Sequence, residues 1–257
     1  MFNLFFSLIV LVFGLIVGSF LNCVIYRLEE NKSFLRGRSF CPQCKHVLAW
    51  YDLIPVFSFL WLNGKCCYCK KPISPQYPLI ELATGVLFVF IYDFLMSDSR
   101  GMSDILFYFV ISGFLMVIFV YDLKHYLIPD KVVYPAIVIT LVYDALRSDL
   151  LGRSELLISA FGAAGFFLAI VLISRGKWMG IGDIKFAFLM GLILGWPNIL
   201  VALFFAFFSG AIIGLGLVMA SKKSFKSEVP FGPFLVAGTI VAMLYGKNLI
   251  NWYLGLF

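Results

Sequence analysis

Long apolar stretches alternate with short polar ones along this chain of 257 residues. A transmembrane helix needs about 20 consecutive apolar residues, and these stretches are apolar on every face. A transmembrane β-barrel would instead alternate apolar and polar residues. The pattern therefore predicts an all-α polytopic membrane protein with about eight transmembrane helices. The predicted spans are residues 4–26, 77–96, 104–121, 132–146, 155–174, 184–196, 199–220 and 234–253.

The composition excludes the common soluble classes of protein. Hydrophobic residues make up 62% of the chain, charged residues 13%, and the mean hydropathy is +0.98. Soluble domains are roughly 45–50% apolar and about 25% charged. A soluble globular domain, a disordered chain and a small disulfide scaffold are thus excluded. Because no basic residue precedes Arg27 and no A-x-A-like site follows the first apolar stretch, that stretch is expected to be a transmembrane helix, not a cleavable signal peptide.

The basic residues predict an orientation in the membrane. With eight spans, 16 of the 20 Lys and Arg residues fall in loops on one side. An excess of positive charge marks the cytoplasmic side, so both chain termini are expected to face outward. The net charge of +6 follows from this asymmetry, and no nucleic acid partner is expected.

Five of the six cysteines lie in the first long polar stretch. Cys41, Cys44, Cys66 and Cys69 form two C-x-x-C pairs, and this spacing is close to a zinc pattern. Four thiolates can bind Zn²⁺ tetrahedrally, and a metal would help to fold so small a module. A redox-active role and uncoordinated thiols are the alternatives. Cys67 is expected to point away from the metal.

Two aspartates stand at the edges of predicted spans. Asp122 ends one span and Asp183 opens another, within Gly180-Ile-Gly-Asp183. The two spans run in opposite directions, so both carboxyls are expected at the same depth on the cytoplasmic side. Two carboxyls that share a proton could activate water, as in aspartic proteases. The alternative for each aspartate is a helix cap.

Glycines and one further carboxylate complete the candidate residues. Gly180 and Gly182 would permit unusual φ angles and let an extended substrate backbone approach Asp183. Glu81, early in the second span, could bind a substrate amine. Close packing between helices is expected at three G-x-x-x-G pairs. These pairs are Gly14/Gly18, Gly191/Gly195 and Gly210/Gly214.

In these motifs the chain resembles the bacterial type IV prepilin peptidases. These are bifunctional enzymes, both leader peptidase and N-methyltransferase, of the G-x-G-D aspartic protease class. The resemblance covers nearly the whole chain, and its motifs follow in order. They are Gly18-Ser-Phe-Leu-Asn22, Cys41-Pro-Gln-Cys44, Trp50-Tyr-Asp-Leu-Ile-Pro55, Gly64-Lys-Cys66, Tyr77-Pro-Leu-Ile-Glu81, the two aspartate motifs and Val229-Pro-Phe-Gly-Pro-Phe234.

The resemblance implies an enzyme of the bacterial inner membrane that cleaves the basic leader of type IV prepilins or type II secretion pseudopilins after a glycine. The same enzyme would then methylate the new N-terminal amine with S-adenosylmethionine. Asp122 and Asp183 would be catalytic, and the four cysteines would bind structural zinc. The implied division is a first transmembrane helix at 1–26, a cytoplasmic four-cysteine zinc module at 27–76 and a seven-helix membrane catalytic domain at 77–257.

Two other classes of function compete with this interpretation. A transporter or channel would need polar residues near the middle of the bilayer, whereas the strongest acidic candidates gather at one face. A membrane thiol oxidoreductase would use the C-x-x-C pairs, and replacing the cysteines would then abolish its activity.

Overall fold

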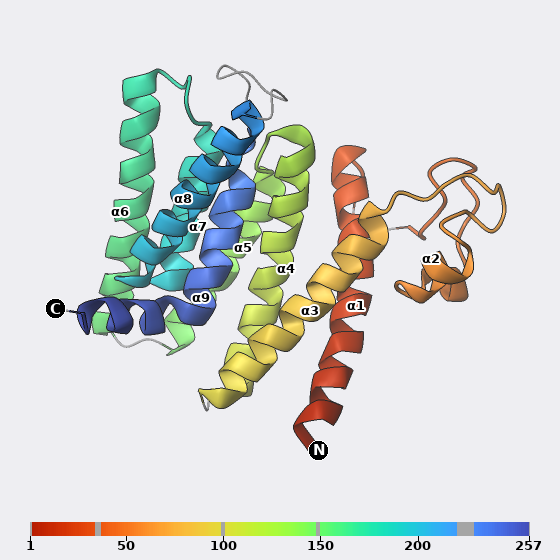
Figure 1. Cartoon of the computed structure of the whole chain (residues 1–257), viewed down its shortest axis with the longest axis horizontal. Coiled ribbons are helices and arrows are strands. Elements are labelled where there is room, and N and C mark those ends of the chain that lie inside the picture. Colours follow the sequence, from red (N-terminus) through yellow and green to blue (C-terminus); the bar gives the residue numbers. More distant parts are fainter. Residues whose placement is uncertain (1, 34–36, 99–100, 148–149, 220–228, 257) are drawn as a thin grey trace. The chain divides into compact units, whose positions relative to one another are not determined.

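The computed structural model describes residues 2–33, 37–98, 101–147, 150–219 and 229–256, and their regular structure is helical apart from two isolated β-bridges. The helices are α1 (Phe2–Glu29), η1 (Trp50–Leu53), α2 (Phe57–Trp61), α3 (Gln76–Ser97), α4 (Met102–His125), α5 (Asp130–Arg147), α6 (Leu150–Ser174), α7 (Ile181–Leu194), α8 (Asn198–Met219) and α9 (Gly232–Leu254) (Figure 1).

Each of the eight predicted spans coincides with one helix. Among the described residues, six helices are long and apolar enough to cross a membrane: α1, α3, α4, α6, α8 and α9. The other two spans correspond to α5, with 18 residues, and α7, with 14. The membrane-protein class is therefore confirmed, with six candidate spans.

The chain divides into two compact units, residues 1–117 and 118–257, and α4 contributes to both. In the first unit α1 packs along α3 (Figure 1). A Cβ added to Gly14 would lie 2.7 Å from the Cα of Gly85, and one added to Gly18 would lie 2.7 Å from the Cα of Glu81. The order of these contacts makes the two helices antiparallel. The first G-x-x-x-G pair thus brings two backbones together, as predicted.

In the second unit α7 is surrounded by α5, α6, α8 and α9. Phe186, Leu189 and Met190 are completely buried, which is expected of a helix that is apolar all round. Gly191 lets α7 approach the backbone of α6 at Ala160. This central position fixes the first turn of α7, which carries Asp183.

The expectation of close helix packing at the third G-x-x-x-G pair, Gly210/Gly214, is wrong. Gly210 meets only aromatic side chains at ordinary distances, and a Cβ on Gly214 would meet nothing within 4 Å. The close approach of α8 and α9 occurs instead at Gly238, which lies against the backbone of Ala202. A G-x-x-x-G spacing gives no information about which face of a helix meets its neighbour.

Part of the basic-residue pattern used for orientation lies outside the described residues. This applies to Arg36, Arg100, Lys222, Lys223 and Lys226.

Candidate active site and metal centre

Asp122 and Asp183 lie at the same end of the second unit. Asp122 is in the last turn of α4, and Asp183 is in the first turn of α7. Both residues are buried, with 4% and 9% of their surfaces exposed. In Figure 1 the end of α4, the connection from α6 to α7 and the start of α9 are all at the upper end. This arrangement agrees with the expectation that both carboxyls lie at the same depth.

The Asp122 carboxylate is held by the start of α9. The backbone N–H of Gly232 donates a hydrogen bond of 2.9 Å to its Oδ2. A Cβ at position 232 would lie 2.6 Å from that oxygen, so only glycine fits without displacement. Gly232 lies in the Val229–Phe234 motif, but the motif alone predicts no role for it in the site. Its 110-residue separation from Asp122 left no local signal.

The Asp183 carboxylate closes back on its own helix start. Its Oδ2 accepts a hydrogen bond of 3.0 Å from the Gly180 N–H, while the Asp183 N–H donates to the Gly180 carbonyl at 3.2 Å. The helix-cap interpretation therefore holds for this side chain, and the contact also orients the carboxyl.

The expectation of unusual φ angles in the G-x-G segment is wrong. Gly180 has φ −83° and ψ 158°, an extended conformation open to any residue, and Gly182 lies within α7. A Cβ on Gly182 would lie 3.1 Å from the Cβ of Ile128, so this glycine allows close packing. Gly180 is exposed, and a Cβ added to it would lie 3.7 Å from Oδ2 of Asp183.

Lys185, two residues after Asp183, is directed to another carboxylate. Its Nζ donates to both oxygens of Asp130 at 2.8 and 2.9 Å. Asp130 is the first residue of α5, so the ion pair joins α5 to α7. Both side chains are partly exposed, so water screens the ion pair and its contribution to stability is small.

The four predicted zinc ligands form one cluster in the first unit. The sulfur atoms of Cys41, Cys44, Cys66 and Cys69 all lie within 4.8 Å of one another. Zinc–sulfur bonds of about 2.3 Å in a tetrahedron place sulfurs about 3.8 Å apart, and the Cys41–Cys69 separation is 4.0 Å. These residues therefore fit a tetrahedral metal ion. Cys67 is exposed and outside the cluster, as predicted.

The two C-x-x-C segments repeat one backbone design. Cys41 N–H donates to the His46 carbonyl, and Cys66 N–H donates to the Lys71 carbonyl, both at 2.9 Å. Lys45 and Lys70 follow the second cysteine of each pair with φ of 61° and 58°. Each segment ends in an isolated antiparallel bridge, Phe40–Val47 and Lys65–Pro72. The repeat, which the cysteine spacing alone does not predict, directs both sulfur pairs to one point.

Hydrogen bonds act in opposite directions on two thiols of the cluster. Burial acts to raise the pKa of the Cys41 thiol, but hydrogen bonds from the backbone N–H groups of Cys44 and Gln43 and with the Cys44 and Cys66 side chains outweigh it and lower that pKa to about 7. The Lys71 backbone acts to lower the pKa of the Cys69 thiol, but burial and hydrogen bonds with the other three cysteines raise that pKa to about 11. The cluster thus favours a thiolate at Cys41. Thiolates, not thiols, are the metal ligands.

Polar side chains on α1 and α3 attach the cysteine-containing segment to these helices. The Arg27 guanidinium donates to the Gly37 carbonyl at 2.8 Å, which holds the segment against the end of α1. The Asn22 amide donates to the Tyr77 carbonyl at 3.0 Å and joins α1 to the first turn of α3. The Oε2 of Glu81, a residue 7% exposed, accepts a hydrogen bond of 2.8 Å from the Val56 N–H. Glu81, considered above as an amine-binding group, thus has a definite positioning contact.

Comparisons with known proteins agree with this arrangement. Residues 12–94 match the family described as the Bacterial Peptidase A24 N-terminal domain, and residues 109–215 match the Type IV leader peptidase family. A protein of Aeromonas hydrophila named prepilin leader peptidase/N-methyltransferase is 32% identical, with 98% of this chain and 94% of the relative covered. A protein of Bacillus subtilis with the same name is 34% identical, with 96% and 97% covered.

The chain belongs to the prepilin leader peptidase/N-methyltransferase family. It is therefore an enzyme of a leader peptidase family, and the resemblance drawn from its motifs is confirmed. A Legionella pneumophila member of the family, 31% identical, is likewise matched over 98% of this chain and 95% of its own length. No solved structure gives a significant match to the chain.

Proposed function

We propose that this enzyme is a membrane aspartic endopeptidase that cleaves the basic leader of type IV prepilins or type II secretion pseudopilins after a glycine, on the cytoplasmic side. It then methylates the new N-terminal residue with S-adenosylmethionine. The observation that carries the peptidase proposal is the pair of buried carboxyls at one end of the second unit, each held by a backbone N–H.

The proposed cleavage uses Asp122 and Asp183 in complementary protonation states. One carboxylate takes a proton from water, and the other carboxyl hydrogen-bonds the scissile carbonyl oxygen. Water oxygen adds to the carbonyl carbon, the carbon–nitrogen bond then breaks, and the proton passes to the leaving amine. The Gly232 and Gly180 N–H groups hold Oδ2 of each carboxyl, so Oδ1 of each is assigned to the reactants.

The proposed substrate approaches along the start of α7. Gly180 is exposed next to the Asp183 carboxylate, and its missing side chain leaves room for an extended peptide. Gly182 contributes by letting α7 lie close to Ile128, which sets the position of that exposed backbone. Both glycines therefore keep a place in the proposal, Gly180 directly and Gly182 through packing.

We also propose the full eight-span topology in the bacterial inner membrane, with α5 and α7 crossing beside the six longer helices and both termini outside. The excess of Lys and Arg in the alternate loops supports this orientation. The lipid bilayer and the prepilin substrate are the expected partners. The proposed active site then lies at the cytoplasmic face, where basic leaders are exposed.

The cysteine cluster is proposed as a structural Zn²⁺ site. Cys41, Cys44, Cys66 and Cys69 would hold the ion, whose charge would favour four thiolates packed together. In the proposed enzyme this module serves the methyltransferase activity. Glu81 remains the candidate for binding the substrate amine, and its Val56 contact links it to the module.

The decisive experiment incubates the purified enzyme with a prepilin, with and without S-adenosylmethionine, and measures the new N-terminus by mass spectrometry. We expect a shortened pilin in both reactions and a gain of one methyl group only when the methyl donor is present. An intact prepilin in both reactions would refute the peptidase proposal.

A further inference from the structure

An aromatic surface of the first unit has no role in the proposed chemistry. It is formed by η1 and α2, where five large apolar side chains are more than half exposed. They are Trp50, Tyr51, Phe57, Leu60 and Trp61. Trp61 is 87% exposed and Trp50 is 78% exposed. Such a surface is unfavourable in water and is typical of an interaction site.

The Glu81–Val56 hydrogen bond fixes the level of this surface along the helices. Glu81 faces Gly18 across the α1–α3 contact, and Val56 directly precedes α2. Gly18 is about 13 Å below Arg27 along the axis of α1, at about 1.5 Å per residue. The apolar half-thickness of a bilayer is about 15 Å. Residues 50–61 therefore lie beside the apolar part of α1.

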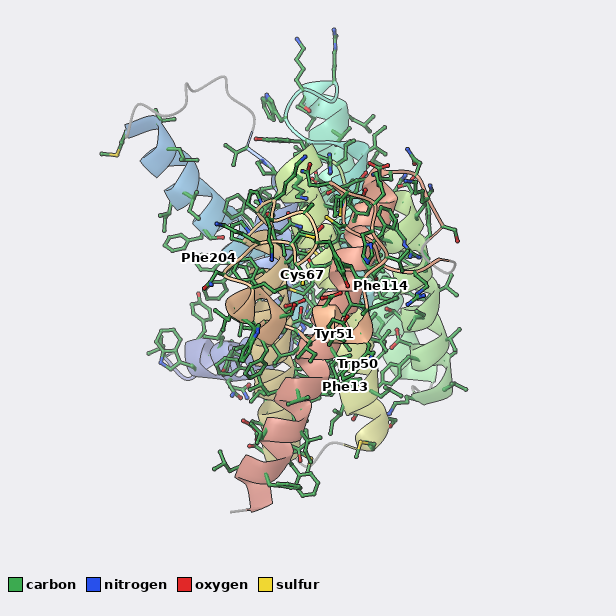
Figure 2. The ribbon with its side chains drawn as sticks, turned by 90° about the vertical axis from the view of Figure 1, so that its right-hand side faces the viewer. Phe13, Trp50, Tyr51, Cys67, Phe114 and Phe204 are labelled. Carbon is green, nitrogen blue, oxygen red and sulfur yellow. The ribbon has the colours of Figure 1, made fainter. Side chains whose placement is uncertain are left out.

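The figures show the same level. In Figure 1 α2 lies beside the middle of α1 and α3 rather than beyond their ends. In Figure 2 Trp50 and Tyr51 are at about the level of Phe13, whereas Cys67 is nearer the C-terminal end of α1. Exposed apolar side chains of α1 and α3 occupy the same depth, among them Phe20 and Leu79.

Around α2 the backbone N–H groups have partners of the kind that immersion in lipid requires. Buried in hydrocarbon, an N–H group must find a partner within the protein. Phe57, Ser58, Leu60 and Leu62 donate to carbonyls within the segment, and Val56 donates to Glu81. Val56 has φ 62°, a rare conformation for a β-branched residue, and the carboxylate holds its N–H in place.

The charge pattern identifies the partner as a lipid surface. Residues 46–64 contain no Lys or Arg, and Asp52 is their one acidic residue. Lys45, Lys65 and Lys70 flank the segment at the cysteine end, and all three are exposed. Tryptophan and tyrosine beside lysines are typical of the boundary between headgroups and acyl chains.

We propose that residues 50–61 form a re-entrant aromatic anchor embedded in the leaflet next to the cysteine cluster, with lipid acyl chains covering its exposed side chains. The cysteine module is then attached to the membrane at three places: the end of α1, the start of α3 and this anchor. In the proposed orientation the leaflet is the cytoplasmic one.

The test uses the full-length enzyme in liposomes with a single tryptophan at position 61, the other four being replaced by phenylalanine. Lipids brominated on their acyl chains quench buried fluorescence, and acrylamide quenches fluorescence exposed to water. We expect brominated lipid to quench Trp61 at least threefold more strongly than acrylamide does. The matched control has all five tryptophans replaced and carries Lys71→Trp, on the exposed cysteine end, where the ratio should be reversed.

Two results would overturn the proposal. One is a Trp61 that behaves like the Lys71→Trp control, which would place the surface in water. The other is loss of lipid quenching when saturating prepilin is added, which would make the substrate helix the partner. In the single-Trp61 protein, Glu81→Ala should shift Trp61 towards shallower bromines, and Glu81→Gln should not. If Glu81→Ala does not fold, the quenching of Trp61 in the single-Trp61 protein still decides between lipid and water as the surroundings of this surface.

Discussion

Replacing Gly232 by alanine tests the part of the proposed active site that depends most on the three-dimensional structure. The new methyl group would lie 2.6 Å from Oδ2 of Asp122. A carbon–oxygen contact needs about 3.3 Å, so the carboxylate or the start of α9 must move by about 0.7 Å. The 2.9 Å hydrogen bond from the Gly232 N–H would then be lost or misaligned.

The size of the effect follows from that hydrogen bond. A bond to a charged group contributes about 1.5–3 kcal/mol, and about 1.4 kcal/mol corresponds to a factor of ten in rate. We therefore expect Gly232→Ala to lower kcat/KM for prepilin cleavage by about 10- to 150-fold if the bond acts in the transition state. The assay follows the shortened pilin over time with purified enzyme in lipid.

The matched control is Gly165→Ala in α6, where an added Cβ would meet nothing within 4 Å. This variant should cleave at the wild-type rate and be equally or more stable, because alanine favours the helix. A Gly232→Ala enzyme with wild-type kcat/KM and wild-type thermal stability would refute the reasoning, since it would show that the position of the Asp122 carboxylate is not critical.

Three further changes test other parts of the structure. Cys66→Ser should reduce bound zinc well below one ion per chain by elemental analysis, and Cys67→Ser should leave one ion bound; equal zinc in both variants would contradict the four-cysteine site. Gly18→Ala should destabilise the first unit by about 1–3 kcal/mol through overpacking, seen as a lower Tm, whereas Gly162→Ala should not; an unchanged Tm for both would refute the close helix contact. Lys185→Ala should leave the Tm almost unchanged and retain cleavage, because water screens its ion pair, and a complete loss of activity would show that this lysine acts in catalysis.

The helices and the cysteine cluster were predictable from the sequence because their signals are local. Eight apolar stretches correspond to eight helices, and the spacing of Cys41, Cys44, Cys66 and Cys69 reflects two turns that each bring a sulfur pair together. Helix direction alone then put Asp122 and Asp183 at one end.

The contacts that complete the sites were not predictable because they join residues far apart in the chain. The Gly232 N–H reaches Asp122, and the Glu81 carboxylate reaches Val56, through packing that no local pattern encodes. The prediction of unusual φ angles in the G-x-G segment was wrong for another reason. Gly182 is needed for its small size against Ile128, so its residue type gave no information about φ.

In the proposed mechanism the Asp122 and Asp183 carboxyls act together on one peptide bond. The most direct test of this mechanism is the cleavage rate of Asp122→Asn and Asp183→Asn enzymes that insert into the membrane and unfold at the wild-type Tm. We expect each substitution to abolish prepilin cleavage. Normal processing by either variant would contradict it.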